Sequence, residues 1–470
     1  FGSSPKMTLF ELIGHPLFSS LAAGATKFSL GICGLKNREE CARMAPMNFP
    51  RVFLKKNEEK EIKGGFLWAF DNELGRVKYF EENEWKECQF LPKESAADFP
   101  IKDGELVELY ANGGAFLGSG IFNRSSKITV RLLGSQKADQ IDADRRAFIL
   151  KRILDALNLR KIHFALSDSF RLVFGEADFL PGFICERYAA EGGKVFLLVQ
   201  FLSLSCEVFR KEIIEALEKA VEPYAIYERG DADVRLKEGL ELKNGWIKKP
   251  KGEDSPTITI VENSVRIQVD MANGQKTGYF LDQKFNRKEI WKYCRGKTVL
   301  DAFSHTGAFG LNAFMAGAKS VLCADISKDA VELINKNIAL NGAEKVVQAL
   351  EADVFDLLKE CEAQEKSFDV IVLDPPAFTK SAKMIQKAYS GYKEINLRAM
   401  RILNPGGILV TCSCSHFFDE SNFYSMLASA AADSRRRVQI LSKGGAAPDH
   451  PILLGYPKSE YLKSAICSVQ

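Results

Sequence analysis

Four carboxylates and a thiol occur where short apolar runs end in the C-terminal half of the sequence. Asp301, Asp325, Asp353 and Asp374 each follow such a run, and Cys414 lies near the end of another. If these runs are parallel strands of a doubly wound sheet, their carboxyl ends meet at one crevice. A single aspartate of this kind is most simply a helix cap or a loop residue. Four of them at successive strand ends indicate a shared binding site.

A glycine turn follows the first of these strand ends, within KTVLDAFSHTGAFG at residues 297–310. Gly307 lets a ligand approach the backbone and leaves the amides at the start of the next helix free. The dinucleotide fingerprint G-x-G-x-x-G is absent. An acidic strand end before such a turn suits a ligand with hydroxyl and amino groups, such as S-adenosylmethionine (SAM).

The spacing of the later strand ends extends this cofactor hypothesis. Asp325 follows the turn at the separation that lets a carboxylate bind both ribose hydroxyls. Asp353 is placed to meet the adenine amine. The predicted cofactor residues of the turn and strand ends are Asp301, Ser304, Thr306, Gly307, Asp325, Ile326, Asp353, Val354 and Asp374.

Composition excludes several classes of protein. The 470 residues are 46% hydrophobic and 27% charged, as in ordinary globular proteins, and the net charge of +3 does not by itself indicate a polyanionic partner. Eleven cysteines without C-x-x-C pairs favour the reducing cytoplasm over a disulfide framework or a zinc ribbon. Five dispersed histidines predict no metal site. No apolar stretch is long enough to span a bilayer, so no membrane partner is expected.

The N-terminal part of the sequence divides into an extension and a β-rich segment. Residues 1–46 are expected to be an upstream extension or an arm without fixed structure, because Met47 immediately precedes the first strand-like run. Residues 47–134 contain many short β-like runs, which predict a small RNA-binding barrel. Trp68 and Phe70 are expected mainly in its core, whereas Lys127 and Arg131 are expected to contact RNA.

The remaining sequence predicts two further domains. Residues 144–245 read as a helix over 144–159, strands, a helix over 206–221 and a strand, which together form a small α+β domain. Residues 245–256 read as an exposed turn or linker. From 257 to 470, strands alternate with helices, the pattern of a doubly wound parallel sheet.

Eight motifs give the sequence a closer resemblance. They are GGFLWAF, RLVFGEADFLPGFICERY, YERGDADVRLKEGL, GQKTGYFLDQKFNR, DAFSHTGAFG, DPPAF, TCSCSH and DHPILLGYPKSEYLK. With them the sequence resembles, from about Phe49 to its end, the bacterial SAM-dependent methyltransferases that modify carbon 5 of a cytosine in 23S ribosomal RNA. The resemblance implies an α/β protein with a PUA barrel, a small α+β domain and a Rossmann-like class I methyltransferase domain. The first 46 residues depart from that pattern.

The resemblance also implies roles for particular residues. On the cofactor side it adds Gln275, Lys276, Tyr279, Phe280 and Asp282, with Gln283 and Arg287 close by. The substrate would be 23S ribosomal RNA, either free or in a large-subunit assembly intermediate. A homodimer is left open.

Methylation at carbon 5 of cytosine requires a nucleophile, because this carbon reacts poorly with the SAM methyl group. A thiolate that adds at carbon 6 makes carbon 5 reactive, with help from an acid and a base. Related enzymes carry this thiol in a Cys-Ser pair at the same strand end, which corresponds to Cys414-Ser415. Cys412-Ser413 is also such a pair, and two residues apart on a strand both side chains point to the same face. Cys414 is favoured over Cys412 as the nucleophile because it lies nearer the crevice. Asp374 would hold the cytosine edge. Pro375 and Pro376 would stiffen the loop and Phe378 would offer a stacking face.

Two other functions remain open. The first is methylation of a purine nitrogen, since DPPAF loosely resembles the Asp/Asn-Pro-Pro-aromatic loops of amino methyltransferases, although Ala377 disturbs the spacing. The second is a non-catalytic RNA-binding assembly factor. The acidic strand ends and the Cys-Ser pair argue against the second.

Overall fold

The computed structural model describes residues 48–470 except 93–97, 253–254, 275–276 and 380. The expectation for residues 1–46, and the cofactor residues Gln275 and Lys276, therefore lie outside the described residues. Within the described ranges, no helix combines the length and the apolar character needed to cross a membrane.

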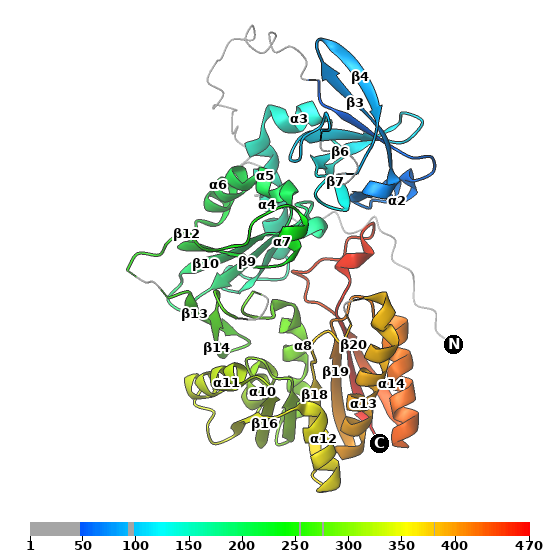
Figure 1. Ribbon diagram of the computed structural model, residues 1–470. Helices are drawn as coiled ribbons and strands as arrows, with labels where there is room; N and C mark the ends of the chain where they lie inside the picture. The colour runs from blue at the N-terminus through cyan, green and yellow to red at the C-terminus, as the bar shows by residue number, and fades with distance from the viewer. Residues whose placement is uncertain (1–47, 93–97, 253–254, 275–276, 380) are drawn as a thin grey trace, which may run out of the picture. The chain divides into compact units, whose positions relative to one another are not determined.

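The N-terminal part is a seven-stranded mixed sheet (Figure 1), in the order β2-β7-β6-β5-β1-β3-β4. Its elements are β1 (Arg51–Leu54), α2 (Glu59–Lys63), β2 (Trp68–Phe70), β3 (Leu74–Glu81), β4 (Glu84–Gln89), β5 (Leu106–Tyr110), β6 (Phe116–Phe122) and β7 (Ile128–Gly134). All neighbours are antiparallel except β1 and β5. Buried residues of β1, β3, β5 and β7 fill its core, as the short apolar runs predict.

The prediction that Arg131 contacts RNA is wrong, because its side chain is only 7% exposed. Its Nη2 donates to Glu238 Oε1 at 2.7 Å, its Nη1 donates to Glu176 Oε1 at 3.4 Å, and its guanidinium lies 5.1 Å from the centre of the Trp68 ring. Glu176 and Glu238, which are distant in sequence, thus stabilise in the interior an arginine that the sequence predicted to be at the surface. Lys127 is exposed, and its contact with RNA stays a prediction.

The second part is a five-stranded sheet in the order β12-β11-β10-β9-β8, with helices against it. Its elements are α3 (Ala138–Ala143), α4 (Arg145–Arg160), β8 (Phe170–Phe174), β9 (Phe183–Ala189), β10 (Val195–Phe201), α5 (Leu204–Val208), α6 (Arg210–Val221), β11 (Ala225–Gly230), α7 (Val234–Lys237) and β12 (Lys243–Lys248). The predicted first helix matches α4, whose start is capped by the Asp144 carboxylate.

Two details of this part differ from the sequence prediction. The helix expected over 206–221 is divided into α5 and α6, which meet at Phe209. Part of the stretch read as an exposed linker is strand β12, paired antiparallel with β11. Trp246 of β12 packs edge-on against Tyr227 at 5.0 Å between ring centroids, a contact that local sequence does not reveal.

The C-terminal part begins with an antiparallel hairpin and continues as a seven-stranded sheet in the order β17-β16-β15-β18-β19-β21-β20. Its strands are β13 (Thr257–Glu262), β14 (Val265–Asp270), β15 (Thr298–Ala302), β16 (Ser320–Asp325), β17 (Val347–Glu351), β18 (Phe368–Leu373), β19 (Leu403–Ser413), β20 (Val438–Gly444) and β21 (Lys463–Val469). The five predicted strands are present, and β15 to β19 pair in parallel. The hairpin β13–β14 does not join this sheet.

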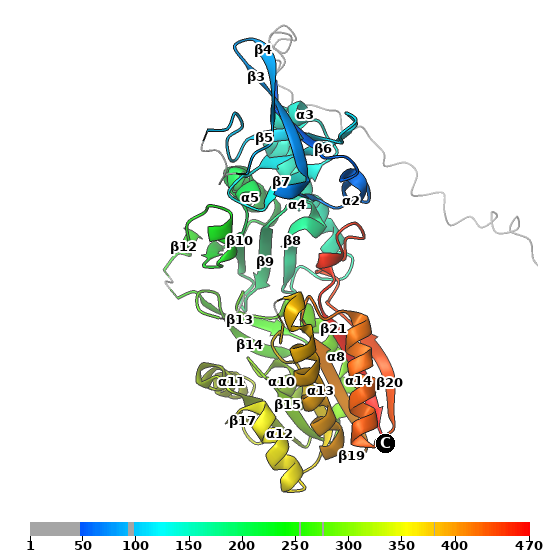
Figure 2. The same cartoon turned by 45° about the vertical axis from the view of Figure 1, so that its right-hand side comes forward.

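Helices cover both faces of this sheet (Figure 2). They are α8 (Lys284–Glu289), α9 (Trp291–Cys294), α10 (Ala308–Met315), α11 (Lys328–Leu340), α12 (Val354–Ala363), α13 (Ile385–Ile402) and α14 (Glu420–Ser434). Val299 packs with α10 and α11, whereas its neighbour Leu300 packs with α12, α13 and α14. This alternation explains the nearly continuous apolar runs, because strands buried on both faces need no polar side.

One segment of the C-terminal part, residues 447–462, contacts both other parts, and we call it the connecting segment. The carbonyl of Asp449 accepts from Arg160 Nη2 of α4 at 2.7 Å. The Tyr456 ring lies 5.1 Å from that of Trp68 in β2, and Lys458 Nζ lies 4.4 Å from the same ring. The connecting segment therefore packs against the first sheet and the second.

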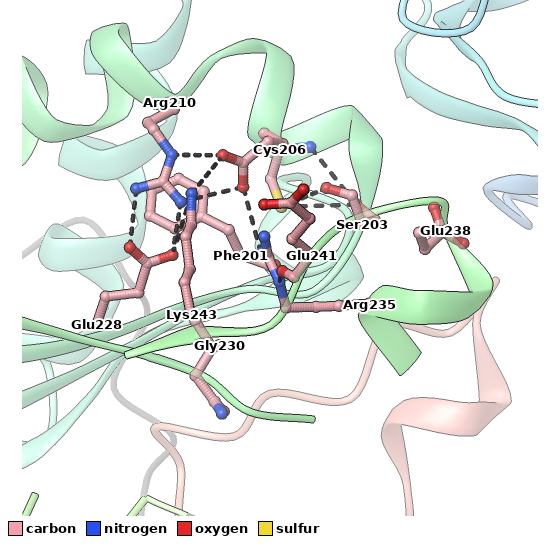
Figure 3. A network of polar contacts seen from close by, with 12 residues as sticks. Phe201, Ser203, Cys206, Arg210, Glu228, Gly230, Arg235, Glu238, Glu241 and Lys243 are labelled. Atoms are coloured by element: carbon pink, nitrogen blue, oxygen red, sulfur yellow. Dashed lines mark hydrogen bonds and ion pairs between the residues drawn. The ribbon is translucent and has the colours of Figure 1, made fainter. Parts of the chain in front are cut away.

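A network of ion pairs stabilises the second part (Figure 3). Arg210 Nε donates to Glu207 at 2.6 Å, and Arg210 Nη2 donates to Glu228 at 2.5 Å. Lys243 Nζ donates to Glu207 at 2.9 Å, while Arg235 donates to the carbonyl of Phe201. Burial alone would raise the pKa of Glu207, but hydrogen bonds and attraction from Arg210 and Lys243 outweigh it and lower the pKa to about 2.

We expect Glu207→Gln to lower the free energy of unfolding at pH 7 by about 2 kcal/mol. A carboxylate with a depressed pKa stabilises the fold above its unfolded-state pKa and loses that contribution as the pH falls through the folded-state value. The difference between variant and parent should therefore shrink between about pH 4.5 and about pH 2. Urea unfolding of both proteins at several pH values measures this difference in the free energy of unfolding.

Glu218→Gln is the matched control, because Glu218 is exposed on α6 and its pair with Lys248 is long at 4.0 Å. This control should change stability by less than about 1 kcal/mol at every pH. A pH-independent difference for Glu207→Gln would contradict the network's role.

Candidate active site

A cavity of about 480 Å³ lies where the parallel strands of the C-terminal seven-stranded sheet end. Most of the predicted residues line it. The predicted cofactor residues on its wall are Tyr279, Phe280, Asp282, Ser304, Thr306, Asp325, Ile326, Asp353, Val354 and Asp374. Cys414, Pro375, Pro376 and Phe378, predicted for catalysis or substrate binding, line the same cavity.

Asp301 is an exception, since it lies beneath the cavity and is 1% exposed. Its Oδ2 accepts from the amide of Gly310 at 2.8 Å, and its carbonyl accepts from Ser304 Oγ at 2.6 Å. Burial raises the pKa of Asp301 to about 7, against the lowering effect of these neighbours. The expectation that Asp301 lines the crevice is therefore wrong. It supports the glycine turn from below.

Gly307 also shapes the cavity without lining it. It is the residue before α10 and has φ = 74°, in the left-handed region that favours glycine. A Cβ at this position would lie 3.1 Å from Ile334 Cγ2. Its amide donates to the carbonyl of Ser304 at 2.8 Å, which closes the turn. Gly307 therefore sets the path of the backbone that passes the cavity.

Asp325 joins the glycine turn to the end of β16. Its Oδ2 accepts from the amide of His305 at 2.9 Å, and its Oδ1 accepts from the amide of Ser327 at 2.9 Å. Because each carboxylate oxygen can accept more than one hydrogen bond, both can still accept from a ligand. Asp353 is held in a similar way, with Oδ1 accepting from the amide of Phe355 at the start of α12 at 2.8 Å.

Asp374 lies at the end of β18 and is oriented by a side chain from another element. Gln283 Nε2 donates to Asp374 Oδ1 at 2.9 Å. The amide oxygen of Gln283 accepts from Asn286 Nδ2 at 2.6 Å, and the same nitrogen donates to the carbonyl of Gly445 at 3.0 Å. This chain of hydrogen bonds fixes the direction in which Asp374 points.

Some of the residues that line or support the cavity were missed by sequence reasoning. Leu462, at the end of the connecting segment, lines the cavity, and although it lies in the motif DHPILLGYPKSEYLK, no role was predicted for it. Tyr461 OH donates to Asp282 Oδ2 at 2.5 Å, so the connecting segment also supports a predicted cofactor residue. His305 lines the cavity with its ring 4.7 Å from that of Phe280. The position of His305 in the glycine turn was the only feature of the sequence that could have indicated this role.

The two cysteines near the end of β19 have different surroundings. Cys412 is 0% exposed, its Sγ lies 3.5 Å from Ser464 Oγ, and burial raises the pKa of its thiol. Cys414 is half-buried and lines the cavity, with Sγ 3.9 Å from the carbonyl of Pro375. β19 ends at Ser413. The strand alternation that would place both thiols on one face therefore does not extend to Cys414.

Aromatic and hydroxyl groups connect the DPPAF loop to the residue after Cys414. The Phe378 ring lies 4.5 Å from that of Tyr392, and Tyr392 OH lies 2.8 Å from Ser415 Oγ. The amide of Thr379 donates to the same Ser415 oxygen at 3.5 Å. Burial, together with repulsion from two lysines, lowers the pKa of His416, which does not line the cavity. These contacts hold two walls of the cavity together.

Comparison with known families gives two matches. Residues 243–451 match the S-adenosylmethionine-dependent methyltransferase family, and residues 52–135 match the PUA-like domain family. The chain is similar to the ribosomal RNA large subunit methyltransferase I of Aliivibrio fischeri, with 37% identity over 423 residues that cover 89% of this chain and 99% of the relative. The protein of the same name from Aeromonas salmonicida is 39% identical over 420 residues, covering 88% and 98%.

Solved structures share the fold. A Streptococcus mutans protein provisionally assigned as a SAM-dependent methyltransferase superposes with a TM-score of 0.69 at 22% identity, covering 89% of this chain and all of that one. A further structure, of a methyltransferase assigned in the same provisional way and complexed with SAH, gives 0.69 at 21% identity with the same coverage. An N-terminal PUA-like domain followed by a Rossmann-like SAM-dependent methyltransferase domain is thus established, as the sequence predicts.

We expect iodoacetamide to alkylate Cys414 and to spare Cys412 in the folded protein. The Cys414 thiol opens onto the cavity, whereas Cys412 is buried and its raised thiol pKa disfavours the reactive thiolate. Tandem mass spectrometry of the peptide that contains both cysteines measures the two rates. Alkylation in urea is the control, since both thiols should then react. Faster labelling of Cys412 in the folded state would contradict the assignment.

Proposed function

We propose that this protein methylates carbon 5 of a cytosine in 23S ribosomal RNA, because the chain belongs to the ribosomal RNA large subunit methyltransferase I family of SAM-dependent enzymes. The reaction would proceed through a covalent bond between Cys414 and the cytosine. The observation that carries the proposal is the common cavity, which is lined by both the Cys414 thiol and the oriented carboxylate of Asp374. Large-subunit RNA, free or in an assembly intermediate, would be the partner.

The cavity suits SAM. Its volume of about 480 Å³ is in the usual range for small-ligand sites. We assign Asp325 to the ribose hydroxyls, because its carboxylate is fixed by two backbone amides and can still accept hydrogen bonds. Asp353 and Val354 would contact the adenine, and Tyr279, Phe280 and Asp282 would contact the remainder of the cofactor. The bound cofactor supplies the methyl group as an electrophile.

The protein's own groups account for the remaining chemistry. The Cys414 thiolate forms a bond to carbon 6 of the cytosine, and the electron pair of the 5,6 double bond becomes available at carbon 5. Asp374 would hold the cytosine edge near ring nitrogen 3, where a proton must accompany addition. After methylation, a base takes the carbon 5 proton to solvent, the electrons of that carbon–hydrogen bond re-form the 5,6 double bond, and the bond between carbon 6 and sulfur breaks to release Cys414 as thiolate. Phe378 and the two prolines before it would bound the base.

RNA affinity would come in part from the PUA-like domain. Lys127 is exposed in the turn before β7 and remains our predicted phosphate contact there. Arg131 is excluded from that role by its burial between Glu176 and Glu238. The basic contribution of this domain to RNA binding is therefore smaller than the sequence suggested.

We expect Asp325→Ala to weaken SAM binding by about tenfold to a hundredfold, because two hydroxyls lose a charged acceptor worth about 1.5–3 kcal/mol. Calorimetric titration with SAM measures the dissociation constant. Asp329→Ala, an exposed change in the first turn of α11, is the matched control and should bind SAM like the parent. Equal dissociation constants for both variants would refute the assignment of Asp325.

We expect Cys414→Ala to abolish methylation while SAM and RNA binding persist, since the thiol acts in a covalent step and not in recognition. Cys412→Ala is the matched control and should keep most of the rate, with a small loss of stability from the cavity it leaves. Incorporation of a radiolabelled methyl group from SAM into large-subunit RNA measures turnover.

Trapping tests the covalent step directly. RNA with 5-fluorocytosine should remain bonded to the enzyme, because the fluorine cannot leave as a proton. The crosslinked peptide should carry the RNA on Cys414. A crosslink on Cys412 would reverse the assignment of the nucleophile. Methylation of ordinary RNA without any adduct would favour the purine-nitrogen reaction, and SAM binding without methylation would favour an assembly factor.

A further inference from the structure

A buried lysine lies beside the strand end that carries Cys414. Lys463 is the first residue of β21, which pairs antiparallel with β19, and its register partner is Ser413. The residue is 8% exposed. A buried ammonium group is costly unless hydrogen bonds or opposite charge compensate it. The groups around the Lys463 ammonium therefore indicate the function of this lysine.

The Lys463 ammonium binds two backbone carbonyls. Nζ donates to the carbonyl of Ser415 at 2.8 Å and to the carbonyl of Tyr461 at 2.8 Å. The first of these carbonyls belongs to the residue directly after Cys414, and the second to the residue before Leu462 of the cavity wall. The lysine thus holds together the two backbone segments that flank the thiol.

Charge is the second observation. The ionised thiol of Cys414 is the negative group that acts most strongly on Lys463, ahead of Asp419 and Glu460. Burial lowers the pKa of Lys463 to about 8, against the raising effect of these groups. At neutral pH the amine is therefore mainly protonated and positive. The other titratable groups that act on this strand end are Asp374, Tyr392, Cys412, His416 and Lys458.

We propose that Lys463 is a positioning residue for the methyl transfer, whose buried positive charge favours the thiolate form of Cys414 and whose hydrogen bonds hold that thiolate against the cavity. The proposal rests on the proposed nucleophilic role of Cys414. Lys463 is the last residue of the motif DHPILLGYPKSEYLK, which the sequence resemblance included without giving this lysine a role.

The step balances without another reactant. The Cys414 thiol releases its proton to solvent, and the ammonium of Lys463 keeps its three protons. The sulfur lone pair then forms the bond to carbon 6, and the negative charge that Lys463 had faced moves onto the cytosine ring, where the proton that accompanies addition near ring nitrogen 3 neutralises it. When the enzyme–RNA bond breaks, the returning thiolate again faces the same ammonium. Lys463 transfers no proton, which distinguishes it from a general base.

The test compares Lys463→Met, Lys463→Arg and Lys458→Met by the pH dependence of Cys414 alkylation. Methionine fills a similar space without charge, arginine keeps the charge, and Lys458 is a nearby cation that contacts Trp68 and not the strand end. The rate at which iodoacetamide alkylates Cys414 is measured by mass spectrometry at about ten pH values between pH 5 and pH 10. SAM binding by calorimetry reports whether each variant is folded.

We expect Lys463→Met to move the midpoint pH of Cys414 alkylation upward by about one unit, so that the rate at pH 7 falls about tenfold. Lys463→Arg should restore the midpoint, and Lys458→Met should move it less than Lys463→Met does. A merely structural lysine would change stability without moving the midpoint. An unchanged midpoint in Lys463→Met therefore overturns the proposal.

Two further readouts keep the test decisive. If Lys463→Met does not bind SAM, Lys463→Gln replaces it, because glutamine is neutral and still donates to the Ser415 carbonyl. An unchanged midpoint in that variant also overturns the proposal. Alkylation requires no RNA, whereas trapping with 5-fluorocytosine RNA tests Cys414 as nucleophile. A shifted midpoint without an RNA adduct on Cys414 would thus support the charge effect and refute the proposed function.

Discussion

The parallel register around β15 determines where two carboxylates of the cavity, Asp325 and Asp374, lie. Ala302, the last residue of β15, pairs with Ala324 of β16 on one side and with Leu373 of β18 on the other. The next residue of each neighbour is an aspartate, Asp325 and Asp374. Because the three strands run in the same direction, these two carboxylates emerge at one level on either side of the glycine turn. A one-residue shift of either strand would direct its carboxylate to the other face of the sheet.

Buried ionic contacts secure the segments that surround this edge. Arg160 of α4 is fully buried and binds Asp178 bidentately at 2.5 and 2.6 Å, and it also donates to the connecting segment at Asp449. Arg131 spans two carboxylates between the first two sheets. Removal of one partner of such a pair would leave a buried charge, which is far more costly than loss of a surface pair. The connecting segment is thereby held where Leu462 can form part of the cavity wall.

The sequence predicted those features that local patterns determine. Apolar runs with acidic ends identified β15, β16, β17 and β18 in order, the run before Cys414 identified β19, and the glycine turn was placed correctly before α10. The failures have a common cause. Arg131 meets Glu176 and Glu238 only in the folded chain, and β12 is a strand because β11 lies beside it. Neither contact has a local signature.

Asp301 and the two cysteines show the same limit within the cavity itself. Asp301 lies one residue before the end of β15, and its carboxylate accepts from the amide of Gly310 beneath the turn. The backbone can approach this closely because residue 310 is glycine, where a Cβ would lie 2.3 Å from Cys323 Sγ. Motif spacing locates the residue and leaves its direction open.

The cysteines differ because β19 extends past the end of β18. Thr411 pairs with Leu373, the last residue of β18, so Cys412 is level with Asp374 in register but still belongs to a strand that is paired with β21 on its other side. Its side chain is therefore enclosed by the sheet and its flanking residues. Cys414 follows Ser413, the last residue of β19 that pairs with β21. Pairing with β21 thus buries one thiol, and the end of that pairing opens the other to the cavity.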